Sequence, residues 1–279
     1  MTDIRYIIPR VIRHFLPENI VRFLMSRSWI IRPGLETRLP FEAADRYQNI
    51  LLANNLGVEN QRVLIFGYGG NFSVGCRLLE LGASHVILAE RTGFQQSTNR
   101  ALLTRYGRFL EEKNGQVLPR PEFFTLIHGD IRLIAARGQI APVDIVLSSS
   151  VFEHLDDVPG ITRALGLLTR GRGVQLHFID LRDHFFKYPF EMLCYTEETW
   201  KNWLNPNSNH NRYRLWDYSR TFDQFFESVD VFVLAREQEA FEKARPRIKA
   251  EFLSGDPMQD AATFIQVIVK YPCTAGEDS

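Results

Sequence analysis

The sequence is short of the features that mark several large protein classes. Its 279 residues include only three cysteines, Cys76, Cys194 and Cys273, without a C-x-x-C spacing. We therefore expect neither a disulfide scaffold nor a zinc cluster, and we favour a reducing cytoplasm. Basic and acidic residues number 33 each, so there is no net charge. Proteins that bind polyanions usually carry a basic excess, which argues against a nucleic-acid partner.

Long apolar runs are also missing. No run reaches the roughly 20 residues that a membrane-spanning helix needs. Asp3, Arg5, Arg10 and Arg13 interrupt the apolar residues at the N-terminus, so we expect no signal peptide. What remains is an ordinary composition, 45% hydrophobic and 24% charged, which predicts a soluble globular protein.

The first 60 residues show a helical pattern with a basic character. Pro9 and Pro17 interrupt it, which predicts two short helices. Two alternatives stay open for this segment: a helical lid packed on the core with its arginines in solvent, which we favour, or a basic amphipathic helix that makes peripheral membrane contact through residues 1–32. The apolar residues that recur at i, i+3 and i+4, predicting one apolar stripe, are Ile4, Ile7, Ile8, Val11, Ile12 and Phe15.

From residue 61 to residue 180, predicted strands and helices alternate. This alternation is typical of right-handed crossovers and of a Rossmann-like parallel sheet with helices on both faces. The predicted strands are 62–66, 85–90, 123–128, 143–147 and 173–179, and the predicted helices are 72–82, 94–113, 131–137 and 158–169.

Residues 181–222 break this rhythm and are crowded with aromatic side chains. A helix near 217–228 and two further strands, 229–235 and 263–270, then predict an antiparallel edge, giving a seven-stranded, mostly parallel α/β sheet. The domain organisation that follows is an N-terminal helical lid (1–58), a core (59–180), an aromatic-rich cap insertion (181–222) and a C-terminal completion of the core sheet (223–279).

The stretch 63–71, VLIFGYGGN, turns from an apolar strand through glycines into a helix, and Glu90 ends the next strand. Glycines let the backbone approach a ligand, a helix N-terminus offers N–H donors, and an acid at a strand end accepts hydrogen bonds from ribose hydroxyls. The order therefore predicts an adenosine pocket. A dinucleotide fingerprint needs a third glycine where Phe72 stands, which weakens the interpretation as an NAD-dependent oxidoreductase.

Two further motifs lie at later strand ends. Asp130 and Ile131 follow the third strand in the string HGDI, and the strand 143–147 runs into the string SSSVFEHL from Ser148 to Leu155. Together with the glycine turn and Glu90, this ordered set resembles the class I S-adenosylmethionine-dependent methyltransferases over residues 60–180. The resemblance implies S-adenosyl-L-methionine as cofactor. The residues it would place around that cofactor are Gly67, Tyr68, Gly69 and Asn71 (amino-acid part), Glu90 with Arg91 beside it (ribose), Asp130 and Ile131 (adenine), and Ser148 and Ser149 (methionine side).

The sequence departs from the family pattern at two positions. Ile65 stands where the family usually has an acid, and Asn71 stands at the third glycine, where it can still adopt a positive φ. Simpler interpretations remain beside the ligand roles: Glu90 could pair with Arg91, Asp130 could cap the next helix, and the serines could be turn residues.

Candidate catalytic groups follow the fourth and fifth strands. They are His154, Asp183 and His184, which could accept a proton from an attacking oxygen or nitrogen. Glu153-His154 looks like part of an E-x-x-E-H metal site, but Ser150 replaces the first glutamate, so we expect no metal. A salt-bridge network with Arg182 is the alternative for the cluster around residues 180–184.

The strings HFIDLRDH (177–184), PFEML (189–193) and NRYR (211–214) are similar to bacterial methyltransferases associated with surface-glycan assembly. We accordingly predict methyl transfer to an oxygen, less probably a nitrogen, of a small-molecule or glycan acceptor. The alternative is a methyltransferase-fold protein that binds the cofactor or a partner without turnover. The identity of the acceptor and the oligomeric state stay open.

Overall fold

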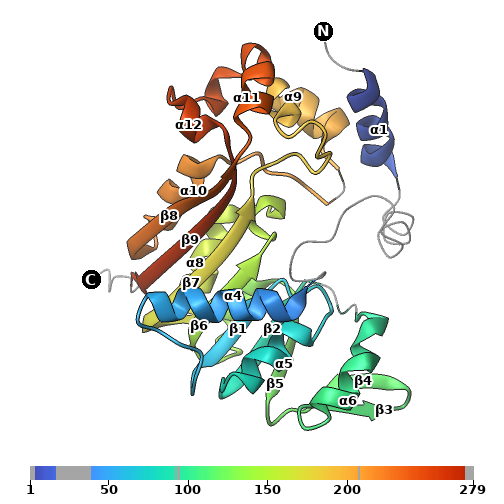
Figure 1. Cartoon of the computed structure of the whole chain (residues 1–279), viewed down its shortest axis with the longest axis vertical. Coiled ribbons are helices and arrows are strands. Elements are labelled where there is room, and N and C mark those ends of the chain that lie inside the picture. Colours follow the sequence, from blue (N-terminus) through green and yellow to red (C-terminus); the bar gives the residue numbers. More distant parts are fainter. Residues whose placement is uncertain (1–3, 17–38, 92, 94, 207, 274–279) are drawn as a thin grey trace.

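The computed structural model describes residues 4–16, 39–91, 93, 95–206 and 208–273. Its centre is a seven-stranded sheet in the order β5-β2-β1-β6-β7-β9-β8 (Figure 1). All neighbouring strands are parallel except β9, which runs antiparallel to β7 and β8. The Rossmann-like, mostly parallel sheet is therefore confirmed. Its strands are β1 (Arg62–Phe66), β2 (His85–Glu90), β5 (Phe124–His128), β6 (Val143–Ser149), β7 (Thr169–Asp180), β8 (Phe226–Arg236) and β9 (Ala262–Pro272).

The strand order reverses between β1 and β6. The chain adds β2 and β5 on one side of β1 and then returns to add β6 and β7 on the other side. Open α/β sheets bind their ligands beside such a reversal, at the carboxyl ends of the strands. The glycine turn follows β1 and the serines end β6, so the topology places both motifs at this point.

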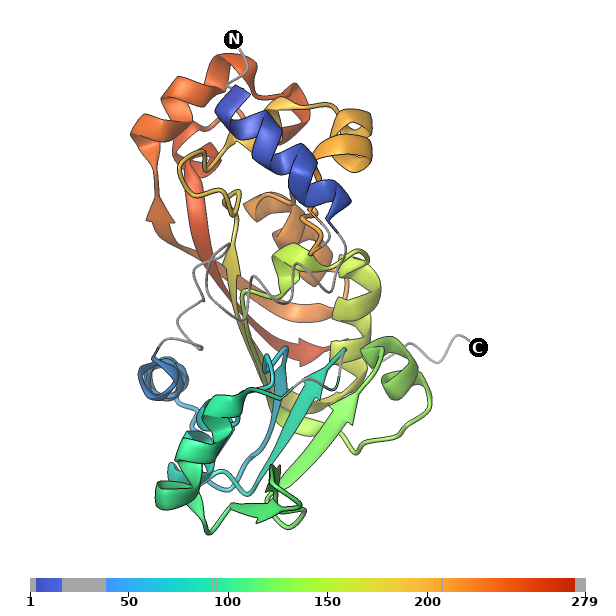
Figure 2. The ribbon, with the colours of Figure 1, turned by 90° about the vertical axis from the view of Figure 1, so that its right-hand side faces the viewer.

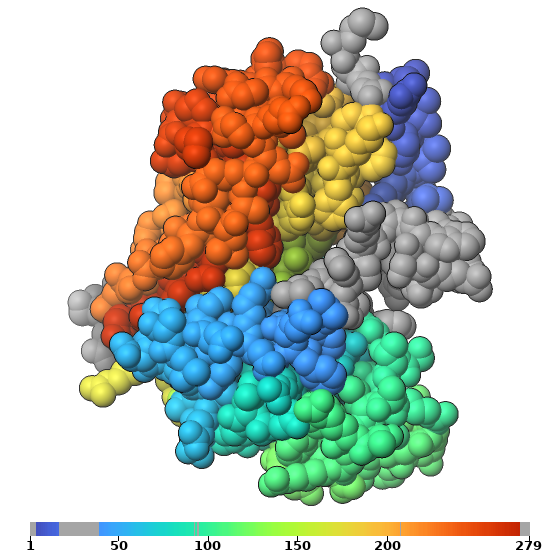
Figure 3. Space-filling view, in the orientation of Figure 1, coloured from blue at the N-terminus to red at the C-terminus, as the bar shows by residue number. Residues whose placement is uncertain are grey.

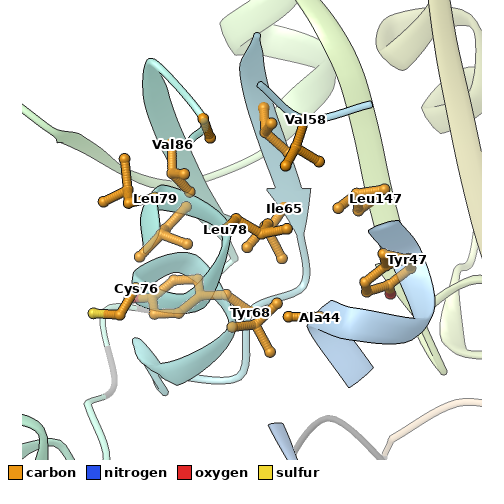
Figure 4. Close-up of a cluster of buried hydrophobic side chains, with 14 of the residues drawn as sticks. Ala44, Tyr47, Val58, Ile65, Tyr68, Cys76, Leu78, Leu79, Val86 and Leu147 are labelled. Atoms are coloured by element: carbon orange, nitrogen blue, oxygen red, sulfur yellow. The ribbon is translucent and has the colours of Figure 1, made fainter. Parts of the chain in front are cut away.

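Alternating strand residues pack under helices on the two faces of the sheet. Figure 4 shows one face, where Ile65 and Leu147 from the sheet gather with Ala44 and Tyr47 of α4 (Pro40–Ala53). α5 (Ser73–Glu80) covers the same face. The opposite face packs against α7 (Ile131–Ala136), α8 (Val158–Leu167) and α10 (Leu215–Phe222).

The helix predicted over 94–113 is wrong in its second half. The chain forms a 3-10 turn η1 (Ser97–Leu102) and a short helix α6 (Leu103–Tyr106), and then a hairpin of β3 (Leu110–Lys113) and β4 (Gln116–Pro119). The turn between these strands is Asn114-Gly115, with φ of 54° and 76°. Asn-Gly is favoured in two-residue hairpin turns because both residues tolerate positive φ, and this local signal outweighed the helical pattern.

The segments beyond β7 and between β8 and β9 share one apolar cluster, which contains Phe190, Trp200 and Phe241. The rings of Phe190 and Phe241 are 5.6 Å apart, so many aromatic residues of this region are core residues. We refer to these elements together as the cap. They are η3 (Glu191–Cys194), α9 (Glu197–Thr199), η4 (Trp200–Leu204), α11 (Gln238–Ala244), η5 (Arg245–Arg247), η6 (Ala250–Phe252) and α12 (Pro257–Asp260).

The N-terminal helix α1 (Ile4–Phe15) lies along the cap (Figures 2 and 3). It continues through Pro9, so the predicted break there is wrong. A proline inside a helix costs about 3 kcal/mol, but Tyr6 and Arg10 anchor the helix to the cap on either side of it. The predicted break at Pro17 lies outside the described residues. No helix in the described part of the chain has the length and apolar character that crossing a bilayer requires.

The predicted single apolar stripe of α1 is in fact two. Ile7 and Val11 pack on the cap cluster. Ile8 and Ile12 point the other way, with 51% and 56% of their surface exposed. Arg10 is buried, so the expectation that all arginines of this segment lie in solvent is also wrong.

Candidate functional site

The glycine turn after β1 takes a backbone shape that only glycine adopts easily. Gly67, Gly69 and Gly70 have φ of 82°, 61° and 75°. A Cβ atom added to Gly67 would lie 2.3 Å from Val151 Cγ2, so the turn and the loop after β6 touch each other. A Cβ atom added to Gly69 would meet nothing within 4 Å, which leaves open space beside the backbone for a ligand.

Glu90 lies directly beside this turn. Its carboxylate accepts hydrogen bonds from the backbone N–H groups of Gly69, at 3.1 Å, and Arg91, at 2.9 Å. No ion pair between the side chains of Glu90 and Arg91 is found among the described residues. The glycine turn and Glu90, which were predicted to act together, are therefore adjacent, as the pairing of β1 with β2 requires.

Sequence reasoning missed Gln96 and Asn99, which hold the glycine turn from outside. Gln96 donates to Gly69 O at 2.9 Å, and Asn99 donates to Gly70 O at 2.9 Å. Asn99 Oδ1 also accepts the N–H of Phe72. Both residues follow β2 in a segment without a motif of its own, so only the folded chain reveals their role.

Asn71 and Tyr68 make contacts inside the protein that the glycine pattern did not indicate. Asn71 does not take a positive φ; Gly70 does so in its place. Asn71 Oδ1 instead accepts the N–H of Ser73 at 2.8 Å at the start of α5. Tyr68 is buried, its hydroxyl is 3.2 Å from His128 Nε2, and burial raises its pKa to about 12. Contact of Asn71 and Tyr68 with the cofactor stays a prediction.

Asp130 has the capping role that was weighed as the alternative. It accepts the N–H of Arg132 at the start of α7, and its two oxygens also receive the guanidinium of Arg132. These hydrogen bonds lower the pKa of the Asp130 carboxyl. Ile131 is buried in the core under this helix. Contact of either residue with an adenine ring stays a prediction.

Ser148 belongs to a buried polar chain inside the fold. Its hydroxyl is 2.8 Å from His177 Nδ1, and His177 Nε2 is 2.9 Å from Gln175 Oε1. Because the amide oxygen can only accept, His177 carries its proton on Nε2 and accepts from Ser148. Burial lowers the pKa of His177 to about 3. Ser149, the next residue, is partly exposed at the strand end, and the methionine contacts of both serines stay predictions.

Glu153 is buried behind this edge. Neither of its carboxylate oxygens has a hydrogen-bond partner of ordinary geometry among the described residues. Burial raises the pKa of Glu153 well above its usual range, and the charge of Asp180 raises it further. The Nε2 atom of His184 lies 4.0 Å from Glu153 Oε1.

His154 and His184, predicted as catalytic groups, do come together, and His210 joins them. The ring centroids are 4.8 Å apart for His154–His184, 4.9 Å for His154–His210 and 4.2 Å for His184–His210. We call these three residues the histidine cluster. His210 was missed because no sequence motif surrounds it. It is positioned by Asn205, whose Oδ1 accepts its N–H at 2.9 Å.

Asp183 lies next to this cluster in the chain but points elsewhere. Its carboxylate accepts the hydroxyl of Tyr6 at 2.5 Å and pairs with Arg10, both from α1. It also accepts the N–H of Phe185. Arg182 pairs with Asp180 and lies near Glu237, which is the salt-bridge network weighed as the alternative for this cluster, and Asp183 is not part of it. We call the contact of Tyr6, Arg10 and Asp183 the α1 clasp.

The string NRYR (211–214), which was compared with bacterial methyltransferases, contains a residue with structural contacts. Arg214 is fully buried and donates to the carbonyl groups of Leu181, Asp260 and Ala262. A hollow of about 640 Å³ lies on the cap, between the loop 187–191 and α11. None of its lining residues belongs to the glycine turn or the histidine cluster, so this hollow does not locate the cofactor.

Comparison with known proteins identifies the fold. No family model matches the sequence, and no curated protein matches it. Among solved structures, a protein from Galdieria sulphuraria provisionally assigned as a sarcosine dimethylglycine methyltransferase superposes with a TM-score of 0.52 and 10% identity, covering 91% of this chain and 98% of that one. A chain of the complex between the Haloferax volcanii Trm112 methyltransferase activator and a provisionally assigned methyltransferase gives 0.51 and 13%, covering 93% and 98%. The chain thus has the Rossmann-like fold found in S-adenosylmethionine-dependent methyltransferases.

Proposed function

We propose that this chain is an S-adenosylmethionine-dependent methyltransferase of the cytoplasm that transfers a methyl group to an oxygen, less favourably a nitrogen, of a small-molecule or glycan acceptor. The observation that carries the proposal is the glycine turn beside Glu90 at the strand-order reversal. The open space next to Gly69 and the neighbouring carboxylate fit a nucleoside with ribose hydroxyls.

When bound, S-adenosylmethionine supplies a sulfonium methyl group that is already a good electrophile. The chain then has to align the attacking atom and exclude water. The loop after β6 suits this task, because Val151 touches Gly67 and the same loop leads into Glu153 and His154. Cofactor and acceptor groups would therefore meet at one edge of the sheet.

The structure favours the histidines over Asp183 for contact with the acceptor. Asp183 is fully buried and already engaged by α1. Burial lowers the pKa of His154 and brings that of His184 to about 2, with the nearby His154 lowering the latter further. Both rings are consequently uncharged at neutral pH, and their unprotonated nitrogens can accept a hydrogen bond from an acceptor hydroxyl.

Calorimetry with S-adenosylmethionine and with S-adenosylhomocysteine tests the cofactor, and release of S-adenosylhomocysteine in the presence of candidate acceptors tests turnover. Binding with turnover supports the enzyme. Binding without turnover on any acceptor favours the non-catalytic alternative. If neither compound binds at millimolar concentration, the proposal fails, and tight NAD(H) binding would revive the oxidoreductase.

A second proposal concerns the outer face of α1, which we propose rests on an anionic membrane surface. Ile4, Ile8, Ile12 and Phe15 lie on it with 51–65% of their surface exposed, and Trp203 of the cap, 55% exposed, lies beside Phe15. Amphipathic helices with apolar and basic residues bind at the headgroup level of anionic bilayers. The basic residues between 17 and 32 in this prediction lie outside the described residues.

A further inference from the structure

The histidine cluster draws its members from three separate places in the fold. His154 ends the 3-10 turn η2 (Phe152–His154) after β6, His184 follows β7, and His210 lies in the loop before α10. One ring nitrogen from each residue lies within 4.8 Å of the others. The three rings are mostly shielded from solvent. Their grouping requires an explanation, because a buried ring nitrogen without a hydrogen bond or a bound ion is unfavourable.

Two ring nitrogens of the cluster have no hydrogen-bond partner among the described residues. They are His184 Nδ1 and His210 Nε2, and both are buried. His154 Nδ1 is 2.8 Å from the carbonyl oxygen of Asn209, which can only accept, so His154 carries its proton there and keeps a lone pair on Nε2. A metal-binding histidine usually has this arrangement, with its second nitrogen donating to a carbonyl or carboxylate group.

We propose that His154, His184 and His210 bind a divalent transition metal ion of the zinc class. Three imidazole ligands suit zinc, and a water molecule can complete a tetrahedral site. His184 would bind through Nδ1, which leaves its Nε2, 4.0 Å from Glu153, to donate to that carboxylate. Glu153 Oε1, which has no hydrogen-bond partner of ordinary geometry among the described residues, would thereby gain one.

The distances require a modest contraction. Tetrahedral ligands at about 2.1 Å from zinc are about 3.4 Å from each other, so nitrogens separated by up to 4.8 Å have to approach by up to about 1.4 Å. His184 can supply this movement, because its Nδ1 makes no hydrogen bond with the described part of the chain that would have to break. Arg10 and Arg13 lie close enough to lower the pKa of His184 and also oppose a cation, but Asp183 neutralises Arg10.

This ligand set differs from the carboxylate site that the sequence argued against. The serine at position 150, in place of a glutamate, argues against a hard ion that needs oxygen ligands. It does not bear on an ion that prefers imidazole nitrogen. Metal binding would use the ring nitrogens of His154 and His184 that the proposed function offers to the acceptor, so the two roles exclude each other. The inference does not depend on the proposed binding of the cofactor.

Metal binding is measured on the full chain after dialysis against a chelator. Zn²⁺ content is determined by mass spectrometry, and Co²⁺, which reports its ligand field by visible absorption, is titrated as the probe. We expect about one equivalent of Co²⁺ to bind, displaced by Zn²⁺. His184→Gln and His210→Gln should each weaken binding by roughly 100-fold or more, since loss of even a supporting group costs 10–100-fold.

His85→Gln is the matched control. His85 lies on β2, its Nε2 is 2.8 Å from Thr125 Oγ1, and it is remote from the cluster in the fold. This variant should bind like the wild type. His210 is buried, so circular dichroism is used to check that each variant folds. His184 is less buried, so His184→Gln tests metal binding with a smaller disturbance of the core. Absence of a Co²⁺ spectrum in the wild type, or equal loss in His85→Gln, overturns the proposal. Calorimetry with S-adenosylmethionine on the metal-free chain keeps this outcome separate from that of the proposed function.

Discussion

Replacing Asp183 by Asn distinguishes a structural role from a catalytic one. In the α1 clasp, Arg10 keeps 3% of its surface exposed and Asp183 keeps 0%. Removing one partner of a buried ion pair costs about 3–5 kcal/mol, because the other charge is left without compensation. Asn retains an oxygen that accepts from Tyr6, so the substitution removes mainly the charge. We expect the docking of α1 to weaken by about 3 kcal/mol, near the low end of that range.

Hydrogen exchange of the backbone amides in residues 4–15 measures this docking directly. The variant should lose protection there by a factor of about 100, the equivalent of about 3 kcal/mol, while amides of β1 and β6 keep theirs. Glu239→Gln is the control, because Glu239 pairs with Lys243 on an exposed helix surface, and it should change nothing measurable. Full protection of α1 combined with complete loss of methyl transfer would refute the clasp and make Asp183 a catalytic residue.

Three other predictions follow from the site. Glu90→Ala should weaken S-adenosylmethionine binding by about 1–3 kcal/mol through loss of charge-assisted hydrogen bonds, and unchanged affinity in calorimetry would show that the ribose assignment is wrong. The folded-state pKa of His177 is about 3, below its usual value, so the unfolded chain binds the extra proton and stability falls as the pH drops below about 6.5. His177→Gln should therefore reduce the pH dependence of the unfolding free energy by about 1.4 kcal/mol per pH unit between about pH 4 and 6, and an identical slope would contradict the buried neutral ring. Ile8→Glu combined with Ile12→Glu should abolish sedimentation of the protein with phosphatidylserine vesicles. The control Leu133→Glu, at an exposed position of α7, should leave sedimentation intact. If the intact chain does not bind vesicles, the membrane proposal fails.

The sheet was predictable because its central strands β1, β2 and β6 are buried on both faces and form short apolar runs between turn signals. β1, β2, β5, β6 and β7 all lie at their predicted positions, and β8 and β9 form the antiparallel edge. The failures have local causes of two kinds. At Asn114-Gly115, the preference of these residues for a hairpin turn outweighed the helical periodicity of the segment. At Pro9, contacts of Tyr6 and Arg10 with the cap stabilise α1 enough for the helix to continue through the proline.

The site was predictable only where its residues are neighbours across parallel strands. Glu90 meets Gly69 because β1 and β2 pair in register and both end at the same edge. Asp130 follows the same rule, but Arg132, two residues later, takes both of its oxygens. The order of motifs does not express this pairing with Arg132, and contact of Asp130 with adenine stays a prediction.

His210 shows why the rest required the folded chain. Its N–H is fixed by Asn205, and its carbonyl oxygen accepts the indole N–H of Trp200 at 3.1 Å. The carbonyl oxygen of Asn209 in turn accepts a hydrogen bond from His154 Nδ1. The first contact lies within the loop and the other two join the loop to η4 and η2, and none leaves a periodic trace in the sequence. The loop is positioned by side-chain hydrogen bonds, whose partners become neighbours only after the cap has packed.

The α1 clasp and the histidine cluster are joined by one peptide bond, between Asp183 and His184. Asp183 is held by α1, and the N–H of Asp183 donates to Pro189 O at 2.9 Å, so the backbone at this point is fixed from two sides. The position of the His184 ring depends on that backbone, because its own Nδ1 makes no hydrogen bond with the described residues. Docking of the N-terminal helix therefore sets the place of one member of the cluster, which connects a segment remote from the sheet to the edge where the cofactor and acceptor would meet.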